Sequence, residues 1–434
     1  MTPATYARIL LDSLGATATP ALIQDCRSAA SLWADSGAMW LSGHANGPPR
    51  LCPAPLAACA QGAWLALASL NPSKLDPLFS AHQLLGERAA IAGLSRQGRT
   101  SAGGACRLLP TLDGYLALNL AREDDWELMP AWLEQGVDSE PELLSILTSY
   151  STELLVERGR LLGLAIAPVA APSPTASWYQ WTRYAPPRLP SSTAPLVVDL
   201  TSLWAGPLCG SVLAQLGARV IKVESTQRPD GARFGPQPFY QLMNAGKESV
   251  ALDLSCTEGR TQLRSLLSHA DIVLEAARPR ALEQMGIVAA DLVRERPGMT
   301  WLSITGYGRR EPMREWIAYG DDAGVAAGLS WLMSAGNTDP VFCGDAVADP
   351  LTGLHAALLA QTAWQQGGGL LLDLPLFDVV SHCINAGTVT ADVSAATWVA
   401  TEENFSVTKP QARALSQAAH PLGQDTARIV QEFL

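Results

Sequence analysis

The stretch from Pro195 to Leu254 constrains the fold more than any other part of the sequence. It begins with Leu196 to Val198, a short apolar and β-branched run that is typical of a strand buried on both faces of a parallel sheet. Ala205-Gly206-Pro207 follows, and its small residues allow a sharp turn and the close approach of another group. We therefore expect a buried strand that ends in a tight turn.

A helix and a second strand are expected directly after this turn. Gly210 to Leu216 has the composition of a short apolar helix, and Gly217 stands where a left-handed cap ends one. Arg219 to Val223 is again a strand pattern, closed by the acidic Glu224. Strand, helix and strand in this order predict a parallel sheet with a ligand at the carboxyl ends of its strands.

Three motifs in this stretch carry a family resemblance. They are D-L-T-x-x-x-A-G-P from Asp199, L-G-A-x-V-I-K-V-E from Leu216, and N-x-G-K-x-S-V-x-L-D-L from Asn244. Their order resembles the class III CoA-transferases, the superfamily of formyl-CoA transferase, carnitine CoA-transferase and α-methylacyl-CoA racemase. The alternative is an ordinary dinucleotide-binding unit, but the first turn lacks G-x-G-x-x-G. The resemblance implies an α/β fold, with a Rossmann-like parallel sheet, flanking helices and a smaller α+β domain.

The composition narrows the class of protein and of partner. A net charge of −11 argues against nucleic acid or an anionic membrane as a bulk partner. No apolar run reaches membrane-spanning length, and the N-terminus lacks a secretory pattern. The eight scattered cysteines are expected to be free thiols in a reducing cytoplasm, and neither they nor the six histidines have metal-ligand spacing. We expect no cofactor, with coenzyme A as a substrate.

The resemblance divides the chain into parts whose order differs from that of the family, where the Rossmann half comes first. A truncated tandem, with the rear half of one copy before the front half of another, explains this order, and so does a circular permutation. The predicted parts are a degenerate rear half (1–105), a small α+β domain that contains a D-G-Y hairpin signal (106–167), a linker rich in proline and serine (168–194), a Rossmann-like catalytic domain (195–390) and a tail with a closing helix (391–434).

Residues 36–70 resemble residues 327–361 and form a candidate degenerate repeat. Both stretches have a Gly-x-x-Trp-Leu opening, a bend that contains proline, and an apolar helix. Chance likeness between two alanine-rich stretches is the alternative. Aligning the helices by Gly62 and Gly353 places Ala58 opposite Asp349, so only the second copy carries a carboxylate at this position.

Asp349, in G-D-A-V-A-D-P-L-T-G, is the predicted nucleophile, because the family places its catalytic aspartate in this setting. A carboxylate that attacks an acyl-CoA thioester forms a mixed anhydride and releases CoA thiolate, which divides a difficult exchange into easier steps. At a helix N-terminus the carboxylate anion and a developing oxyanion are both stabilised. The alternative is that Asp349 is an ordinary helix cap.

Asp321 and Asp322 lie where the family carries G-x-D. In the racemase branch the x residue is a histidine that acts as a base, whereas here it is Asp321. Two carboxylates can exchange a proton in principle, but the missing histidine counts against racemisation. A solvated helix start is the alternative for this pair.

The resemblance also indicates where CoA binds. The turn at Leu203, Trp204 and Ala205 is expected to pass close to the thioester arm. Departures from the family occur at Ser225, at Ala276-Ala277-Arg278-Pro279 and at residues 365–370. The candidates for the CoA phosphates, which pair well with cationic side chains, are Arg228, Arg233, Lys247, Arg278 and Arg280.

The sequence thus predicts a cytoplasmic class III CoA-transferase that moves CoA between an acyl-CoA and a carboxylic acid through Asp349. Acyl-CoA racemisation or epimerisation is a second hypothesis. A non-catalytic subunit that binds acyl-CoA is a third. We expect a homodimer, as in the family.

Overall fold

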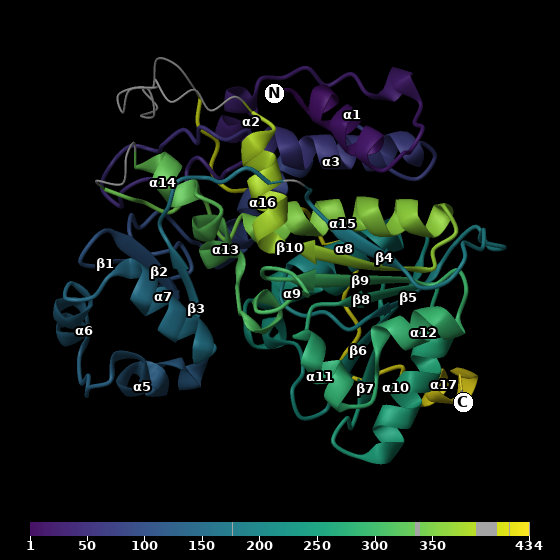
Figure 1. The fold of residues 1–434 in the computed structure, drawn as a ribbon. Helices are drawn as coiled ribbons and strands as arrows, with labels where there is room; N and C mark the ends of the chain where they lie inside the picture. Colours follow the sequence, from purple (N-terminus) through teal and green to yellow (C-terminus); the bar gives the residue numbers. More distant parts are fainter. Residues whose placement is uncertain (176, 335–338, 388–405, 416, 434) are drawn as a thin grey trace.

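The computed structural model describes residues 1–175, 177–334, 339–387, 406–415 and 417–433 (Figure 1). Its centre is a seven-stranded sheet that is parallel except for one edge strand, β4. In spatial order the strands are β4 (Gln180–Arg183), β10 (Leu370–Pro375), β9 (Thr300–Thr305), β8 (Ile272–Glu275), β5 (Leu196–Asp199), β6 (Arg219–Ser225) and β7 (Glu248–Leu252).

The six parallel strands, numbered along the chain, lie in the Rossmann order 3-2-1-4-5-6. The order reverses between β5 and β8, and such a switch point opens a crevice at the carboxyl ends of the strands. Val197 and Val198 are both fully buried and belong to two different apolar clusters, one on each face of the sheet. The sheet is therefore covered on both sides, as its apolar strands predict.

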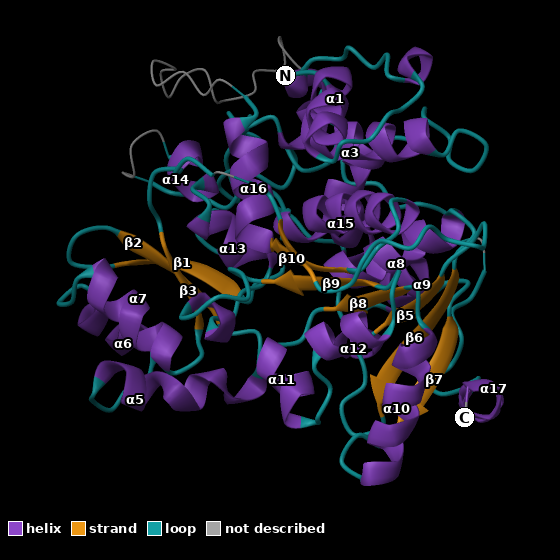
Figure 2. Ribbon diagram, turned by 45° about the vertical axis from the view of Figure 1, so that its right-hand side comes forward, coloured by secondary structure: helices purple, strands orange, loops and turns teal. Residues whose placement is uncertain are grey.

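Helices cover both faces of the sheet (Figure 2). One cluster contains residues of α8 (Ala205–Gln215), α9 (Gln237–Asn244), α15 (Ala348–Gln365) and α16 (Leu376–Asn385). The other contains residues of α10 (Thr257–His269), α11 (Pro279–Gln284), α12 (Ala289–Glu295) and α17 (Thr426–Phe433). The expected helix after Ala205-Gly206-Pro207 thus includes that turn, and Gly217 has the left-handed φ of 91° expected of a cap.

A small antiparallel sheet lies beside the main sheet, at the left of Figure 1. Its strands, in order, are β1 (Cys106–Pro110), β2 (Tyr115–Asn119) and β3 (Ala165–Pro168). The D-G-Y signal indeed falls in the hairpin between β1 and β2. The helices of this unit are α5 (Met129–Leu133), α6 (Glu140–Leu147) and α7 (Thr152–Leu161). Its core is a separate apolar cluster.

The segment from 168 to 194, expected as a linker, contributes structure of its own. Within it, Gln180–Arg183 forms β4 and pairs antiparallel with β10. This edge strand is exposed along its length. An exposed polar strand can form at a sheet edge because its ladder bonds come from a partner and need little apolar burial of its own.

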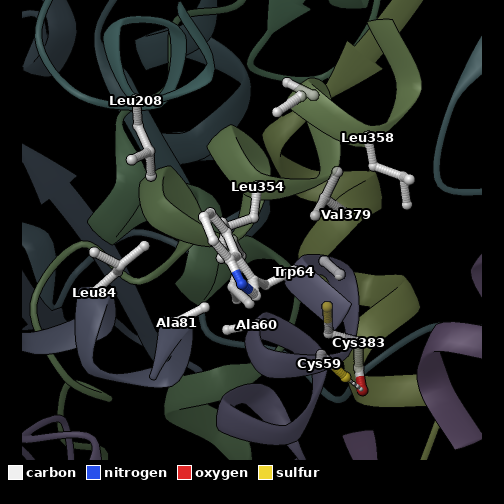
Figure 3. Close-up of a cluster of buried hydrophobic side chains, with 14 of the residues drawn as sticks. Cys59, Ala60, Trp64, Ala81, Leu84, Leu208, Leu354, Leu358, Val379 and Cys383 are labelled. Carbon is white, nitrogen blue, oxygen red and sulfur yellow. Dashed lines mark hydrogen bonds between the residues drawn. The ribbon is translucent and has the colours of Figure 1, made fainter. Parts of the chain in front are cut away.

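The N-terminal helical layer, as we call α1 (Pro3–Ser13), α2 (Ala29–Asp35), α3 (Leu56–Leu70) and α4 (Glu87–Ala92), packs through α3 onto α15, and Figure 1 shows α1 and α3 on the side of α15 away from the sheet. In α3 almost every residue is buried, because this helix is packed between α1 and α15. Trp64 of α3 lies among Leu84, Leu208 and Leu354 (Figure 3). The layer therefore shares one apolar core with the parallel sheet.

The two stretches of the candidate repeat end in helices that pack against each other, α3 and α15. Gly62 and Gly353 have matching surroundings. A Cβ on Gly62 would meet the carbonyl oxygen of Pro3, the first residue of α1, and a Cβ on Gly353 would meet that of Ala205, the first residue of α8. Ala58 is fully buried in the shared core, so the first copy presents an apolar side chain at the position of Asp349.

Two short helices, α13 (Gly320–Ala326) and α14 (Leu329–Met333), connect the parallel sheet with the small unit. The α13 helix contacts β2, β3, α15 and α16. In the described part of the chain, no helix is both long and apolar enough to cross a membrane.

Candidate active site

A cavity of about 380 Å³ opens at the switch point of the parallel sheet. Its walls are the segments that follow β5, β8 and β9, together with the starts of α15 and α16. Such a position, at the carboxyl ends of the strands, is where α/β sheets bind ligands. Its lining includes Leu203, Ala205, Arg278, Tyr319, Asp349 and Arg122.

Asp349, the second residue of α15, lines this cavity. A tight turn precedes it, in which Gly344 has a φ of 70° and Ala346 a φ of 45°, an uncommon value for a residue with a side chain. The main-chain N–H of Asp349 donates to the carbonyl of Ala346 at 2.9 Å. A strained backbone of this kind persists where the surroundings fix it, and here it holds the carboxylate at the cavity.

Two other segments contact the Asp349 carboxylate. The main-chain N–H of Ala205, the first residue of α8, interacts with it and lowers its pKa. On another side the backbone of Gly320 is so close that a Cβ there would lie 2.3 Å from Oδ2 of Asp349. The carboxylate is therefore enclosed by α8, α13 and α15, and it lies next to the Trp204 turn.

Burial is the main reason that the pKa of Asp349 is raised to about 7. The guanidinium of Arg88 acts in the opposite direction, while the neighbouring carboxylates of Asp321 and Asp345 raise the pKa further. A carboxyl with a pKa close to neutral is ionised in a substantial fraction of molecules and is more basic than an exposed aspartate. Both properties suit a nucleophile.

The side chains of Asp321 and Asp322, the neighbouring acidic pair, have different hydrogen-bond partners. Asp321 accepts a hydrogen bond at 2.9 Å from the main-chain N–H of Ala346, and burial next to Asp345 raises its pKa to about 6. Asp322 is fully buried and instead accepts from Asn119 of β2 at 2.9 Å. Burial raises the pKa of Asp322 to about 7. Only Asp321 therefore belongs to the surroundings of Asp349.

Comparison with known proteins agrees with this geometry. The sequence model of the family described as CoA-transferase family III matches residues 195–414, half of the chain, including all six parallel strands and Asp349. The chain belongs to CoA-transferase family III.

Several curated proteins are similar to this family III chain. It is 33% identical over 216 residues to succinate–glutarate CoA-transferase of Agrobacterium fabrum, covering 45% of this chain and 53% of that protein. It is 30% identical over 195 residues to succinyl-CoA–D-citramalate CoA-transferase of Chloroflexus aurantiacus, covering 42% and 48%. A crystal structure of a CAIB/BAIF family protein from Brucella suis is 32% identical, covers 43% and 53%, and has a TM-score of 0.39. The chain spans about half the length of the curated relatives it matches.

In this family III chain the expected thioester turn borders the cavity. Leu203 and Ala205 line the cavity, whereas the side chain of Trp204 is buried behind them. Leu203 has a left-handed φ of 71° and is 43% exposed, and its N–H donates to Asp230 Oδ1 at 2.9 Å. The turn thus presents an apolar side chain and the N-terminus of α8 to the cavity.

The arginines proposed for the CoA phosphates differ in their surroundings. Arg278 lines the cavity, and among the described residues we find no hydrogen bond or ion pair that engages its guanidinium. Burial, and repulsion from Arg280 and Arg122, lower the pKa of Arg278. Arg280 lies outside the cavity lining and pairs with Glu315 at 3.2 Å, while Arg228 is exposed. Of these three, Arg278 has the surroundings of an anion ligand.

Two candidates for the phosphates have other partners, and the expectation for them needs correction. The ammonium of Lys247 is fully buried and donates to Asp199 at 2.8 Å, to the Pro207 carbonyl at 2.9 Å and to Asn244 at 3.1 Å. These bonds use all three donors of the ammonium, so Lys247 is a structural cation beneath the sheet switch point.

The expectation that Arg233 binds the CoA phosphates also needs correction. Arg233 forms a two-pronged pair with Glu224, at 2.9 and 2.6 Å, and stacks over Tyr240 with 4.4 Å from its Cζ to the ring centroid. Glu224, in turn, is buried, and both of its carboxylate oxygens accept from Arg233. The cationic fork of Arg233 is therefore engaged within the protein.

Other site residues were not found by sequence reasoning. Arg122 comes from the segment after β2 and lines the cavity, as do Arg314, Trp316 and Tyr319 from the segment between β9 and α13. Arg88 and Asp345 lie next to Asp349. No motif marked them, because most belong to segments that only the tertiary fold brings to the cavity. Among the described residues, no group of three His, Cys, Asp or Glu side chains could hold a metal ion.

Proposed function

We propose that this chain transfers CoA from an acyl-CoA to a carboxylic acid through covalent intermediates on Asp349. The observation that carries the proposal is a half-buried carboxylate that lines a cavity at the sheet switch point, next to the first N–H of α8. Membership in CoA-transferase family III supports the same chemistry. Because the chain matches only about half the length of the curated relatives, their activities are not carried over to it directly.

The first two steps form a thioester on the enzyme. The Asp349 carboxylate attacks the thioester carbonyl, the C–S bond breaks, and an aspartyl–acyl anhydride and CoA thiolate result. The thiolate then attacks the aspartyl carbonyl, which releases the first carboxylate and leaves CoA as a thioester on Asp349. The second half reverses these steps with an acceptor carboxylate. The acceptor displaces CoA thiolate to form a new anhydride, and the thiolate then attacks the acceptor acyl carbonyl, which gives the new acyl-CoA and regenerates the Asp349 carboxylate, so no proton or oxidant is consumed.

The surroundings of Asp349 assist both steps. Each attack develops negative charge on a carbonyl oxygen, and the N-terminus of α8 offers main-chain N–H groups to such an oxyanion. Gly206, next to Ala205, packs so closely on Thr201 that a Cβ would lie 2.2 Å from its side chain. This close packing fixes the helix start, and a fixed donor needs little rearrangement during the reaction.

For the substrates, we propose succinyl-CoA as the first donor to be tested, since relatives are named for succinyl-CoA or succinate. We assign Arg278 to the anionic part of CoA, with Arg228 and Arg280 as outer candidates. A cytoplasmic location and a homodimer stay predictions, and the mass of the protein in solution tests the latter.

Racemisation remains the second hypothesis, because Asp321 provides one further carboxyl near Asp349. Against it, the lining of the cavity in the described part of the chain contains no histidine. The non-catalytic hypothesis predicts CoA binding without any covalent product.

The deciding experiment is intact-protein mass spectrometry after incubation with succinyl-CoA, with and without hydroxylamine. We expect a CoA-sized adduct on the wild type that hydroxylamine removes, mapped by peptide analysis to Asp349, and no adduct on Asp349→Ala. Exchange of the α-hydrogen of the acyl-CoA with deuterated solvent, without an adduct, would favour racemisation. Binding of CoA with neither result would favour the non-catalytic hypothesis.

A further inference from the structure

Arg88, in the N-terminal helical layer, reaches the candidate active site. It lies on α4, and its Nε and Nη2 donate to Oδ2 and Oδ1 of Asp345 at 2.9 and 2.5 Å. Asp345 is fully buried and belongs to the tight turn that precedes Asp349. A two-pronged pair between a guanidinium and a buried carboxylate fixes the orientation of both groups. Arg88 therefore holds the turn from which α15 begins.

The same guanidinium also contacts the second segment that positions Asp349. Its Cζ lies 5.3 Å from the centroid of the Trp204 ring, within the range of a cation–π interaction. Trp204 directly precedes Ala205, whose N–H interacts with the Asp349 carboxylate. Arg88 thus connects the turn before α15 with the turn before α8, the two segments between which the carboxylate lies.

Charge gives Arg88 a further role. The carboxylate of Asp345 raises the pKa of Asp321 on α13, and both Asp321 and Asp345 raise the pKa of Asp349. Arg88 is the cation that opposes this effect at both Asp321 and Asp349. Among the described residues, the cavity lining also contains the charged side chains of Arg122, Arg278 and Arg314.

Arg88 also lies in a restricted space. A Cβ on Gly103 would be 3.2 Å from its Nη2, so the guanidinium also has a close backbone neighbour. Part of the side chain, 31% of its surface, remains exposed. A side chain that is held by an ion pair, a ring and a neighbouring backbone retains little freedom to move.

We propose that Arg88 is a positioning residue for the Asp349 nucleophile, which it serves by binding Asp345 and covering Trp204. This inference rests on the proposed function. It implies that the N-terminal helical layer supplies a side chain, Arg88, that the Asp349 carboxylate needs in order to be correctly placed.

The neighbouring residue provides a matched control. Glu87, also on α4 and 1% exposed, forms a two-pronged pair with Arg413 at 2.7 and 2.8 Å. This pair anchors the same helix, α4, but neither of its groups is among the main charges that shift the pKa of Asp349. A merely structural role of Arg88 predicts that Glu87→Gln and Arg88→Gln have similar effects.

The test measures single-turnover formation of the CoA adduct from succinyl-CoA against pH in the wild type, Arg88→Gln, Arg88→Lys and Glu87→Gln. In Arg88→Gln we expect the maximal rate to fall roughly 10- to 100-fold, KM to change less than about threefold, and the acid limb to move up by about one pH unit. Arg88→Lys keeps the positive charge but loses the two parallel N–H donors of the guanidinium. We therefore expect the acid limb of its pH–rate profile to stay in place and its maximal rate to fall. Glu87→Gln should leave both unchanged.

An unshifted limb in Arg88→Gln, or an equal effect of Glu87→Gln, would overturn the proposal. If Arg88→Gln does not fold, Arg88→Lys decides: a wild-type rate overturns the proposal, and a reduced rate with an unshifted limb supports it. Absence of any adduct on the wild type refutes the proposed function itself, and the role of Arg88 with it.

Discussion

The backbone of Gly320 lies directly against the carboxylate of Asp349, so that a Cβ at position 320 would be 2.3 Å from Oδ2. It would also lie 2.6 Å from the carbonyl oxygen of Ala346, in the turn that leads to Asp349. Real Cβ atoms do not approach other atoms so closely, and backbone atoms cannot easily move away. The position of the predicted nucleophile therefore depends on the absence of a side chain on another helix.

The first prediction concerns Gly320→Ala. The added methyl group displaces the carboxylate, and we expect kcat/KM for CoA transfer to fall roughly 100-fold, since small misplacements of a nucleophile are costly. Gly324→Ala, on the same helix, is the control, because its Cβ meets only the end of the Leu329 side chain at 3.3 Å. Steady-state kinetics on both variants make the comparison. Equal loss in both would show that α13 as a whole, and not this contact, had been disturbed.

The second prediction concerns Asp349→Asn and stability. Because the pKa of Asp349 is raised to about 7, the folded protein binds its proton more tightly than the unfolded chain does. Ionisation in the folded state therefore lowers the free energy of unfolding as pH rises from about 4 to about 7. Asparagine removes this cost, so the variant should be more stable than the wild type by up to about 4 kcal/mol at pH 8, and about equal below pH 4.

Urea unfolding at several pH values measures this difference, and Asp425→Asn is a control of opposite sign. Burial by itself would raise the pKa of Asp425, but hydrogen bonds from His420 and from the Ser249 N–H lower it. The Asp425 carboxylate thus stabilises the fold above its unfolded pKa, and its removal should cost stability at neutral pH. An Asp349→Asn variant less stable than the wild type at pH 8 would contradict the second prediction.

The third prediction tests Lys247 as a structural cation. Lys247→Met leaves the buried carboxylate of Asp199 without its ion-pair partner, and we expect a loss of about 3 kcal/mol in the free energy of unfolding. Arg228→Met, at an exposed arginine, should stay within about 0.5 kcal/mol of the wild type. Denaturant titration checks both values. If Lys247→Met keeps normal stability but loses CoA binding, Lys247 is instead a ligand of the CoA phosphates.

The fourth prediction separates two neighbouring arginines. Arg278→Gln should raise the Kd for CoA about tenfold and reduce its salt dependence, because a charge-assisted hydrogen bond is lost. Arg280→Gln should change Kd much less, since the guanidinium of Arg280 already pairs with Glu315. Calorimetric titration with free CoA at two salt concentrations measures both. If the two variants weaken binding equally, Arg278 has no special place at the cavity.

Local sequence predicted much of this fold. The order of apolar runs and small residues between Pro195 and Leu254 predicted β5, α8 and β6, and Gly217 ends α8 as expected. These features could be predicted because side-chain periodicity and glycine conformations act over a few residues. The hairpin between β1 and β2 was predicted for the same reason.

The candidate site was predicted less evenly. Asp349 and the Leu203–Ala205 turn were identified through motifs and lie together at one cavity, while the catalytic role of Asp349 stays a prediction. Lys247 stood in an equally strong motif, but its ammonium is occupied by Asp199. A motif indicates that a residue type is needed at a position, and it does not distinguish a ligand contact from a buried ion pair.

The sequence by itself determined most of the strand and helix pattern of the parallel sheet and the switch-point topology that this pattern favours, and it singled out Asp349 as the candidate nucleophile. Only the tertiary structure decided which charges face the cavity and which neutralise each other. Arg88 and Asp345 are separated by 257 positions, and their pairing depends on the tertiary packing that brings α4 next to the turn before α15. The physical reason is that charges interact through space, across distances that only the packing of the whole chain sets.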